Sequence, residues 1–434
     1  MVREGPCDAA REGPCDAAQE GPCDAARDQA RAGLYVHVPF CAARCSYCDF
    51  STGTLSVAKL GRYLDALERE IARRAPPAAG LRFTSVFFGG GTPSAIGAAA
   101  FERIARVLAA AFDIAPGAEF TLEANPESVR PALLEAWSAA GVNRLSLGAQ
   151  SFVPEELATL ARIHAAGRPA AALALARAHG FRRLSLDLMF GFPGQTAASW
   201  DRTLEAALAL APEHFSAYCL IPEAGTPLGD AVLAGATALP APEAQAEAYE
   251  VLTARLEAAG YGCYETSNFC RPGAEARHNL VYWLRRPYLG LGPSAHGFDG
   301  ATRYGNHRAL QRWAAALEAG APPEAEVERA SEESAAAEAM MLGLRLATGL
   351  RPADHPPALR AALERRYGAA LAAAVAGGRL VTDGASFRIP RPLRFVADDV
   401  IAWIAAAAAR ARVDSRRACS VPSMPCPSPP SPAA

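Results

Sequence analysis

The sequence predicts an α/β protein built on a parallel sheet, either doubly wound or curved into an incomplete (β/α) barrel. Two observations predict this class. Short β-rich runs alternate with amphipathic helical patterns, and polar residues or glycines follow the ends of the runs. A third observation, the strongly helical segment AEAMMLGLRLATGL, predicts a small, mainly helical C-terminal domain.

The predicted elements alternate regularly along the first half of the chain. In the first helical pattern, Leu60, Leu64 and Ile71 fall on one face at 3.6-residue spacing. Helices are expected at 56–75, 101–112, 131–140 and 200–210. Strands are expected at 34–38, 82–88, 119–123, 144–147, 183–189 and 214–220. This alternation is typical of parallel βαβ units.

The two ends of the chain differ from its middle. Residues 3–26 read REGPCDAA, REGPCDAA, QEGPCDAA, and the Gly-Pro of each copy interrupts any helix. We therefore expect residues 1–32 to form a disordered octapeptide-repeat tail, and the Pro- and Ser-rich residues 412–434 a second disordered tail. Between them we expect the barrel with a C-terminal extension over 33–300 and an accessory domain over 301–411.

The composition excludes several classes of partner. The 434 residues carry a formal net charge of -2, which gives no basic footprint for nucleic acid or an anionic membrane. No run of about eighteen uncharged apolar residues occurs, so no membrane span is expected. The first residues lack the apolar centre of a secretory signal, and the 11 cysteines do not form a compact disulfide framework. We therefore expect a cytoplasmic protein.

The segment CAARCSYCDF carries three cysteines in the spacing C-x3-C-x2-C, with no fourth cysteine nearby. A structural zinc site needs four ligands, and an electron-carrying iron–sulfur cluster usually takes four thiolates. Thiolates from Cys41, Cys45 and Cys48 on a 4Fe–4S cluster would leave one iron open for a small molecule. The alternative is a three-cysteine zinc site completed by a histidine or another cysteine.

Glycines and polar residues follow the ends of the predicted strands. The cysteine loop follows the first strand, and GGGT, from Gly89 to Thr92, follows the second. The carboxyl ends of barrel strands open onto one face, where active sites are built. We therefore expect one rim to carry both loops together with Glu123, Gln150, Asp187 and Cys219. Glycine amides there could approach a ligand closely, although GGGT alone could be a tight turn.

The cysteine loop after a first strand resembles the radical S-adenosylmethionine (radical SAM) superfamily, whose fold is a partial (β/α)6 barrel. The resemblance implies a 4Fe–4S cluster held by Cys41, Cys45 and Cys48, with the amino and carboxylate groups of S-adenosylmethionine on the open iron. It also implies a reductant for the cluster, because an electron from the cluster cleaves the sulfonium to a 5′-deoxyadenosyl radical. The protein positions such a cofactor and excludes competing reactions.

A longer series of motifs narrows the resemblance to one branch. YVHVPFCAARCSYCDF, FFGGGTPS, FTLEANPE, RLSLGAQSF, ARIHAAG, LSLDLMFGFPGQT and SAYCLIPEAGTPL occur in the order seen in oxygen-independent coproporphyrinogen III oxidase and its relatives. The match spans about residues 33–403. The oxidase has a fourth cysteine where this chain has Phe50. SNF, GLGPSAH and HNLVYW, which fits an HNxxYW motif, are instead similar to the HemW haem-chaperone family.

This second resemblance implies a protein that binds haem and passes it to an acceptor protein. An oxidase-type radical enzyme acting on coproporphyrinogen III stays open as the alternative, and a non-catalytic zinc or cluster protein as a third. Because Phe50 replaces the fourth cysteine, we expect no coproporphyrinogen dehydrogenase activity. The sequence alone leaves open whether the protein is an enzyme.

The resemblance also implies contacts to S-adenosylmethionine. Tyr35, Gly90 and Glu123 match positions that contact the cluster-bound molecule, and the peptide beside His296 matches another. Contacts to a second S-adenosylmethionine are matched by Tyr47, Gly91, Thr92, Gln150, Arg162, Asp187 and Cys219. From the residues alone, Asp187 could equally form an ion pair with Arg162 or Arg183.

The HNLVYW segment implies a haem site. Its histidine, His278, matches a haem ligand, and a neutral imidazole is a good axial ligand for haem iron. Tyr282 and Trp283 could pack against the macrocycle. The residues alone also allow His278 to be a hydrogen-bonded structural residue beside aromatic rings.

Overall fold

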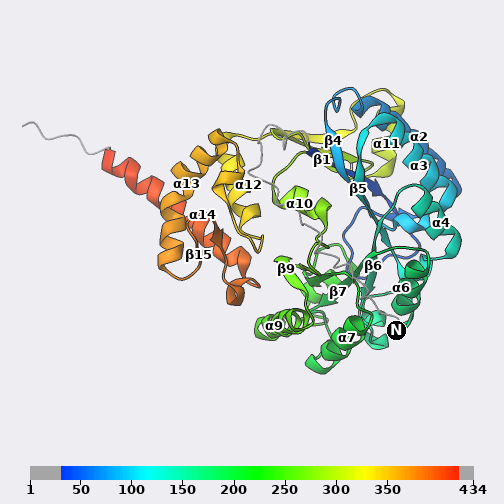
Figure 1. Cartoon of the computed structure of the whole chain (residues 1–434), viewed down its shortest axis with the longest axis horizontal. Coiled ribbons are helices and arrows are strands. Elements are labelled where there is room, and N and C mark those ends of the chain that lie inside the picture. Colours follow the sequence, from blue (N-terminus) through cyan, green and yellow to red (C-terminus); the bar gives the residue numbers. More distant parts are fainter. Residues whose placement is uncertain (1–30, 420–434) are drawn as a thin grey trace, which may run out of the picture.

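The computed structural model describes residues 31–419, with side chains over 31–411, and it contains one twelve-stranded sheet. The sheet runs in the order β14, β13, β12, β11, β1, β4, β5, β6, β7, β8, β10, β9, so β14 and β9 are its open edges. Six of its parallel strands form the barrel: β1 (Arg31–Val38), β4 (Arg82–Gly90), β5 (Asp113–Ala124), β6 (Arg144–Gln150), β7 (Arg183–Phe190) and β8 (His214–Cys219). The predicted α/β fold with a partial (β/α)6 barrel is confirmed (Figure 1).

Shorter strands extend the sheet on both sides. β11 (Tyr288–Leu291) pairs parallel with β1, although it lies far along the chain. β12 (His296–Phe298), β13 (Thr302–Asn306) and β14 (Glu324–Arg329) follow it as an antiparallel ribbon. On the other side, β10 (Asn268–Cys270) pairs antiparallel with β8, and β9 (Gly262–Glu265) pairs with β10.

Helices cover the convex face of the curved sheet, as Figure 1 shows for α2, α3, α4, α6 and α7. The predicted helices correspond to α2 (Val57–Arg74), α3 (Ala98–Ala111), α4 (Pro131–Ala139) and α7 (Ala197–Ala209). The others of this region are α5 (Pro154–Thr159), α6 (Arg168–Ala178), α8 (Pro227–Leu233), α9 (Pro242–Ala258) and α11 (Leu310–Glu318). In contrast, α10 (Arg277–Trp283) lies on the concave side, where it contacts β1 and β4 (Figure 1).

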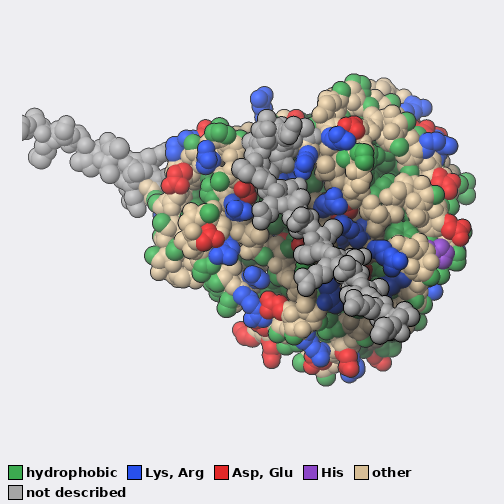
Figure 2. Space-filling view, viewed as in Figure 1, with side chains coloured by type: hydrophobic (Ala, Val, Ile, Leu, Met, Phe, Trp, Pro, Cys, Tyr) green, Lys and Arg blue, Asp and Glu red, His purple; other side chains and the backbone are tan. Residues whose placement is uncertain are grey.

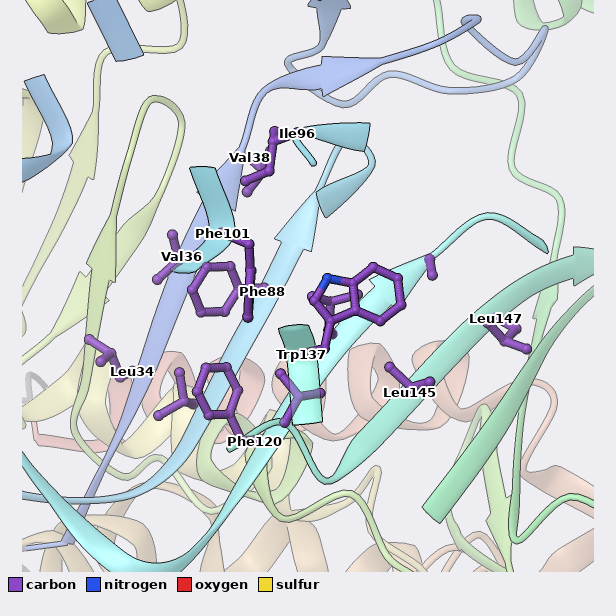
Figure 3. Packing of buried hydrophobic residues seen from close by; sticks show 14 of the residues in the cluster. Leu34, Val36, Val38, Phe88, Ile96, Phe101, Phe120, Trp137, Leu145 and Leu147 are labelled. Carbon is purple, nitrogen blue, oxygen red and sulfur yellow. The ribbon is translucent and has the colours of Figure 1, made fainter. Parts of the chain in front are cut away.

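Alternation along the strands separates the core from the barrel interior. Leu34 and Val36 of β1 have no exposed area, and they pack with Phe88 and Phe101 in the main hydrophobic cluster (Figure 3). Because successive side chains of a strand point to opposite faces, the intervening residues of β1, such as Tyr35, point into the barrel. The convex face is therefore apolar and helix-covered, and the concave face is free for a site.

A second hydrophobic cluster holds the C-terminal helices together. It contains Ala336, Leu363 and Ile404, from α12 (Glu332–Gly343), α13 (Pro357–Ala376) and α14 (Ala397–Cys419). The remaining elements of this part are the short pair β15 (Val381–Thr382) and β16 (Phe387–Arg388). The predicted small, mainly helical domain is present.

The sequence-based domain limits differ from these clusters. Trp313 and Leu317 of α11 belong to the main cluster, and β13 and β14 extend the main sheet, so the first core reaches beyond residue 301. The polar hairpin β13–β14 pairs through backbone bonds, which leave little signal in the sequence. Arg31 and Ala32 belong to β1, and residues 1–30 lie outside the described part.

The prediction of a disordered tail from residue 412 is wrong for its first part. Helix α14 continues through Cys419. The alanine-rich segment has no proline or glycine before Pro422, so nothing in it breaks the helix earlier. Residues 420–434 are not described by the structure.

The surface carries both signs of charge. Figure 2 shows Lys and Arg side chains gathered near the middle of one face and acidic side chains mainly toward its edges. Across the part of the chain that is described, no helix combines the length and apolarity needed to span a bilayer.

Candidate functional site

A cavity of about 410 Å³ lies at the carboxyl ends of the parallel strands and extends down into the barrel. The cysteine loop and the glycine loop form its mouth, and alternate residues of β5 to β8 form its walls. Most of the predicted site residues line it together: Cys41, Cys45, Tyr47, Cys48, Gly90, Gly91, Thr92, Glu123, Gln150, Arg162 and Asp187. Phe50 lines it as well.

The three cysteines of the loop are free thiols, each partly exposed. Thr92 Oγ1 donates a hydrogen bond to Cys41 Sγ at 3.3 Å, and Arg162 Nη1 donates one to Cys45 Sγ at 3.3 Å. Burial raises the pKa of Cys41 and of Cys48, whereas the Arg162 guanidinium acts to lower the pKa of Cys41. A cationic donor therefore stands beside the loop, where it would stabilise thiolates.

The arrangement of the thiols suits a cluster. β2 (Phe40–Cys41) and β3 (Gly53–Thr54) pair at the base of the loop and close it. Among the side chains of residues 31–411, no three of His, Cys, Asp or Glu converge as one metal ion would require. A 4Fe–4S cube does not need such convergence, because each thiolate binds a different iron. The donor set thus fits a cube with one iron left open.

The glycine loop packs tightly against the start of the cysteine loop. Gly90 has φ 103°, and a Cβ there would lie 2.5 Å from the His37 ring. A Cβ on Gly91 would lie 2.7 Å from the carbonyl oxygen of Phe40. Both positions therefore require glycine.

The expectation that the amides of this loop are free for a ligand is wrong for three of them. Gly90 N donates to Glu123 Oε2 at 3.2 Å, Gly91 N to Val38 O at 2.8 Å, and Thr92 N to Phe40 O at 2.7 Å. These bonds fix the loop onto the end of β1. Its glycines serve close packing rather than an open amide cradle.

Two partly buried carboxyl groups, Glu123 of β5 and Asp187 of β7, line the cavity. Burial and, next, the charge of Asp187 raise the pKa of Glu123 to about 8. Burial raises the pKa of Asp187 to about 6, although bonds from Ser146 and Ser216 act against this. At neutral pH, Glu123 is therefore mainly protonated and can donate a hydrogen bond, whereas Asp187 is mainly ionised.

The ion pair considered for Asp187 is not formed among the side chains of residues 31–411. Ser146 Oγ donates to Asp187 Oδ1 at 2.9 Å, and Arg183 pairs with Glu119 at 3.8 Å. Arg162 acts on Asp187 only through space, by lowering its pKa.

Arg162 joins the mouth of the cavity to its wall. Its Nη2 donates to Asn125 Oδ1 at 2.7 Å and to Gly148 O at 2.6 Å, while Nη1 reaches Cys45. Beside it, Gln150 ends β6 with φ 64°, a left-handed conformation that is unusual for a residue with a side chain. Such conformations gather at functional sites because the surrounding structure must hold them.

Several predicted residues do not line this cavity. The Tyr35 hydroxyl bonds His37 Nδ1 at 3.1 Å below the mouth. Cys219 Sγ lies 3.6 Å from Gln245 Oε1, and His296 points to solvent, with Nδ1 3.9 Å from Glu326. Tyr35 points into the barrel but lies below the mouth. Cys219 follows Tyr218, which lines the cavity, so its own side chain points to the opposite face of β8.

The HNLVYW segment forms α10, on the concave side of the sheet. His278 is 1% exposed, and burial lowers its pKa to about 3, so it is neutral. Its Nδ1 lies 2.9 Å from Ser85 Oγ, its Nε2 lies 2.8 Å from the Tyr282 hydroxyl, and its ring stacks on Phe87. Trp283 lies under Arg345, whose guanidinium carbon is 5.8 Å from the ring centroid. Both nitrogens of His278 are thus already bonded.

Sequence reasoning missed the inner wall of the cavity. Phe87, Thr121, Asn125, Arg144, Ser146, Ser185, His214, Ser216, Tyr218 and Asn279 line it. The signal was present in segments such as RLSLGAQ and RLSLDLM, where polar residues alternate with leucines. Because only the ends of the strands were considered, this alternation of polar and apolar residues within the strands was overlooked.

Comparisons with known proteins agree with this geometry. Residues 35–207 match the model of the radical SAM superfamily. The chain is 41% identical over 374 residues to heme chaperone HemW of Mycobacterium tuberculosis (strain CDC 1551 / Oshkosh), covering 85% of this chain and 93% of that one. It is 36% identical over 320 residues to heme chaperone HemW of Bacillus subtilis (strain 168), covering 73% and 84%.

A solved structure shares the fold. Coproporphyrinogen III oxidase (HemN) from Escherichia coli, a radical SAM enzyme, superimposes with a TM-score of 0.76. The alignment covers 88% of this chain and 92% of that one at 23% sequence identity.

Proposed function

Because this chain belongs to the HemW family, within the radical SAM superfamily, we propose that it is a haem chaperone that binds haem and transfers it to an acceptor protein. The observation that carries the proposal is the 41% identity to a heme chaperone over 93% of that relative's length. The reducing cytoplasm is the proposed compartment, since it keeps free thiols such as Cys41 available for iron.

The cysteine loop would hold a 4Fe–4S cluster through Cys41, Cys45 and Cys48. When bound, such a cluster supplies one electron for the reductive cleavage of S-adenosylmethionine. Arg162 would stabilise the thiolate of Cys45, to which it already donates a hydrogen bond. Thr92 would do the same for Cys41.

The cavity below the loop would hold S-adenosylmethionine. Gly90 and Glu123 are its proposed contacts, since both line the cavity beside the thiols. Glu123 offers a hydrogen bond donor when protonated and an acceptor when ionised. A second molecule is proposed against the other lining residues of the mouth, Tyr47, Gly91, Thr92, Gln150, Arg162 and Asp187.

The proposed haem ligand is His278. Its low pKa supports this role, because a neutral imidazole is the form that binds iron. Its burial sets a condition: Nδ1 must leave Ser85 or Nε2 must leave Tyr282 before iron can bind. Tyr282 and Trp283 lie on the same helix, so an opening of α10 would bring all three to the macrocycle.

The likeness to coproporphyrinogen III oxidase supports the fold alone, at 23% identity. Phe50 stands where that oxidase has a fourth cysteine, and it is 58% exposed at the mouth of the cavity. A phenyl ring cannot supply a thiol, so we do not propose porphyrinogen decarboxylation.

The test uses the full chain, reconstituted anaerobically with iron and sulfide. As a chaperone, it should bind about one haem per chain, give a Soret band, and release haem to an apo-acceptor. With S-adenosylmethionine and a reductant, it should not convert coproporphyrinogen III. Conversion to protoporphyrinogen, or the absence of haem binding, would contradict the proposal.

A further inference from the structure

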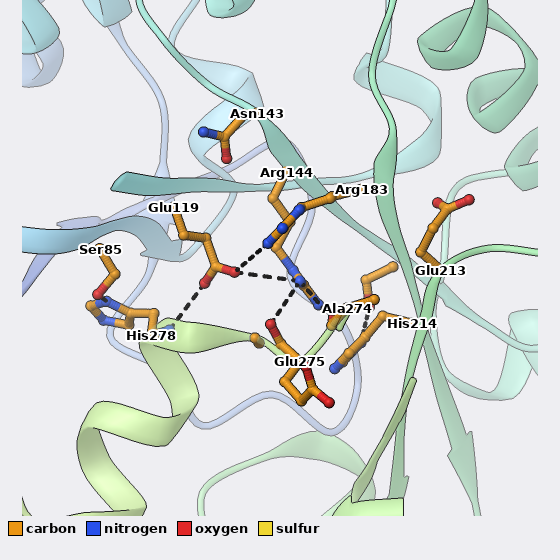
Figure 4. Close-up of polar contacts among 12 residues, drawn as sticks. Ser85, Glu119, Asn143, Arg144, Arg183, Glu213, His214, Ala274, Glu275 and His278 are labelled. Atoms are coloured by element: carbon orange, nitrogen blue, oxygen red, sulfur yellow. Dashed lines mark hydrogen bonds and ion pairs between the residues drawn. The ribbon is translucent and has the colours of Figure 1, made fainter. Parts of the chain in front are cut away.

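The lower end of the cavity contains a buried arginine that is only partly used. Arg144 is 2% exposed. Its Nη1 donates to Ala274 O at 3.0 Å and to Glu275 O at 3.3 Å, and lies 3.4 Å from Glu119 Oε2 (Figure 4). Its Nη2 is buried and has no hydrogen bond partner among residues 31–411. Leaving such a donor unpaired in the interior costs free energy. The unpaired Nη2 therefore indicates that a bound molecule supplies the missing hydrogen bond acceptor.

Two further polar groups at the same end also lack partners. Thr121 lies directly opposite Arg144 across the β5–β6 ladder, so the two side chains are neighbours on the concave face. Its Oγ1 is buried and unbonded within the described chain. The partly exposed Asn279 side chain lines the same cavity and has no hydrogen bond partner among residues 31–411. Its neighbour His278 donates from N to Glu119, which lies 3.4 Å from Arg144, so this turn of α10 lies near the same end. A guanidinium and a hydroxyl that are neighbours on the concave face, and an amide from α10, therefore line one cavity.

The local charge at this end is positive. Glu119 accepts from His278 N at 3.0 Å and is shared by Arg144 and Arg183, at 3.4 and 3.8 Å (Figure 4). Two guanidiniums thus share one carboxylate, so Glu119 alone does not neutralise Arg144. His214 lines the same end, but burial lowers its pKa well below the usual value, so it adds no charge.

The opposing charge lies higher in the cavity. Asp187 lies opposite Gly148, two layers above Arg144 toward the mouth, and it is mainly ionised at neutral pH. It would repel an anion in transit, whereas Arg144 would attract the anion once it reached the end. A ligand that satisfies both must carry its negative charge at one tip and no negative charge along its stem. The stem would lie beside Phe87 and Met189, which give the middle of the cavity apolar surface.

We propose that Arg144, Thr121 and Asn279 form a subsite for a carboxylate carried on a short, uncharged stem. An arginine and a carboxylate make strong, directional hydrogen bonds, and the hydroxyl and amide complete the oxygen's partners. The source is either a free short-chain carboxylic acid or a propionate side chain of a porphyrin. The subsite stands without the haem assignment, because it rests on the cavity alone.

The first arm of the test compares butyrate with butyramide, which has the same shape and no charge. Binding to the full chain is measured by saturation-transfer NMR and by the rise in melting temperature. Butyrate should bind and butyramide should not. Equal binding of both, or binding of neither, would overturn the proposal, since the lower end of the cavity would then hold only water or nonspecific solute.

Two variants locate the bound carboxylate. Asn279→Asp places a carboxylate of the chain's own beside Arg144, so butyrate affinity should fall at least about tenfold. Thr121→Val removes an unbonded hydroxyl without changing shape, so it should fold normally and lose about threefold or more in affinity. Gln311→Glu adds the same charge as Asn279→Asp on the exposed face of α11, and it should leave butyrate binding unchanged. Unchanged affinity in both cavity variants would overturn the assignment.

The second arm distinguishes the two sources by comparing haem with haem dimethyl ester. Weaker binding of the ester, with the same loss for haem in Thr121→Val, would identify a porphyrin propionate. Equal binding of haem and ester would identify a free acid. If haem does not bind at all, the proposed chaperone function is contradicted. The comparison of butyrate with butyramide still tests whether the carboxylate subsite exists.

Discussion

The imidazole of His278 lies 2.8 Å from the hydroxyl of Tyr282, one turn along α10, and 2.9 Å from Ser85 of β4. These two bonds hold the proposed haem ligand in the barrel interior with neither nitrogen free. Haem binding through His278 must therefore compete with a bond inside the protein.

This competition predicts that Tyr282→Phe binds haem more tightly than the unchanged protein. Losing one neutral hydrogen bond of about 1 kcal/mol should raise affinity about fivefold. His278→Ala should weaken haem binding and shift the Soret band. Tyr288→Phe, which removes a neighbouring hydroxyl that does not touch His278, serves as the control. Haem titration followed by absorbance measures all three variants. An unchanged Soret band in His278→Ala would show that His278 is a structural residue and not the haem ligand.

The cysteine loop gives a second prediction. Changing Cys41, Cys45 and Cys48 together to Ala should abolish the broad visible absorption of a reconstituted 4Fe–4S cluster, because no thiolate of the loop remains. Each single change should leave the cluster labile. Cys263→Ala, a change in β9 outside the cavity, should keep normal iron content. Iron and sulfide analysis decides this, and equal iron in the triple variant and the parent would contradict it.

A third prediction concerns the pH dependence of stability. The pKa of Glu123 is about 8 in the folded chain and lies near 4.5 when exposed. Between these values the folded state holds more protons than the unfolded state, so stability falls as pH rises from 5 to 8.

Glu123→Gln should therefore lose less stability over this range than the parent, with about 4 kcal/mol as the upper bound of the difference over three pH units. Urea unfolding of the cluster-free chain at pH 5, 6.5 and 8 measures it. Glu102→Gln, on the exposed face of α3, should follow the parent. A parallel pH profile for Glu123→Gln would show that this carboxyl titrates normally.

A fourth prediction concerns Glu70, a fully buried acid on α2. Its oxygens accept from Gly292 N at 2.8 Å, Asn306 Nδ2 at 2.7 Å and Trp313 Nε1 at 3.1 Å, so it joins α2 to β13, α11 and the residue that follows β11. Glu70→Ala leaves three buried donors unpaired and should cost roughly 3–5 kcal/mol.

The matched control for Glu70 lies two residues earlier on the same helix. Glu68 bonds Arg103 at the surface, and Glu68→Ala should cost less than about 1 kcal/mol. Chemical denaturation of both variants gives the comparison. Similar losses in the two would mean that the buried network of Glu70 does not stabilise the sheet.

Local periodicity was enough to predict the frame of the barrel. The run 82–88 became β4 with two more residues, and the pattern at 131–140 became α4 almost unchanged. Because parallel strands share a direction, placing Cys41 and Asp187 near strand ends also placed them at one cavity. These inferences needed only neighbours in the sequence.

The features that were missed depend on partners distant in the chain. The hydrogen bond between Ser85 and His278 joins β4 to α10, and no local sequence pattern predicts it. The pairing of β13 with β14 comes from backbone groups, which every residue carries. The helix beyond residue 412 was missed because a Pro-rich end was taken to begin too early.

The central position of β1 has a consequence for how the protein is made. Tyr35 pairs with Phe87 on one side and with Gly290 on the other, so β1 gains its second neighbour only after most of the chain has left the ribosome. Pairing over such long separations is slow, because the intervening chain must be ordered first. The strand that carries the cysteine loop is therefore synthesised early and gains its last neighbour late.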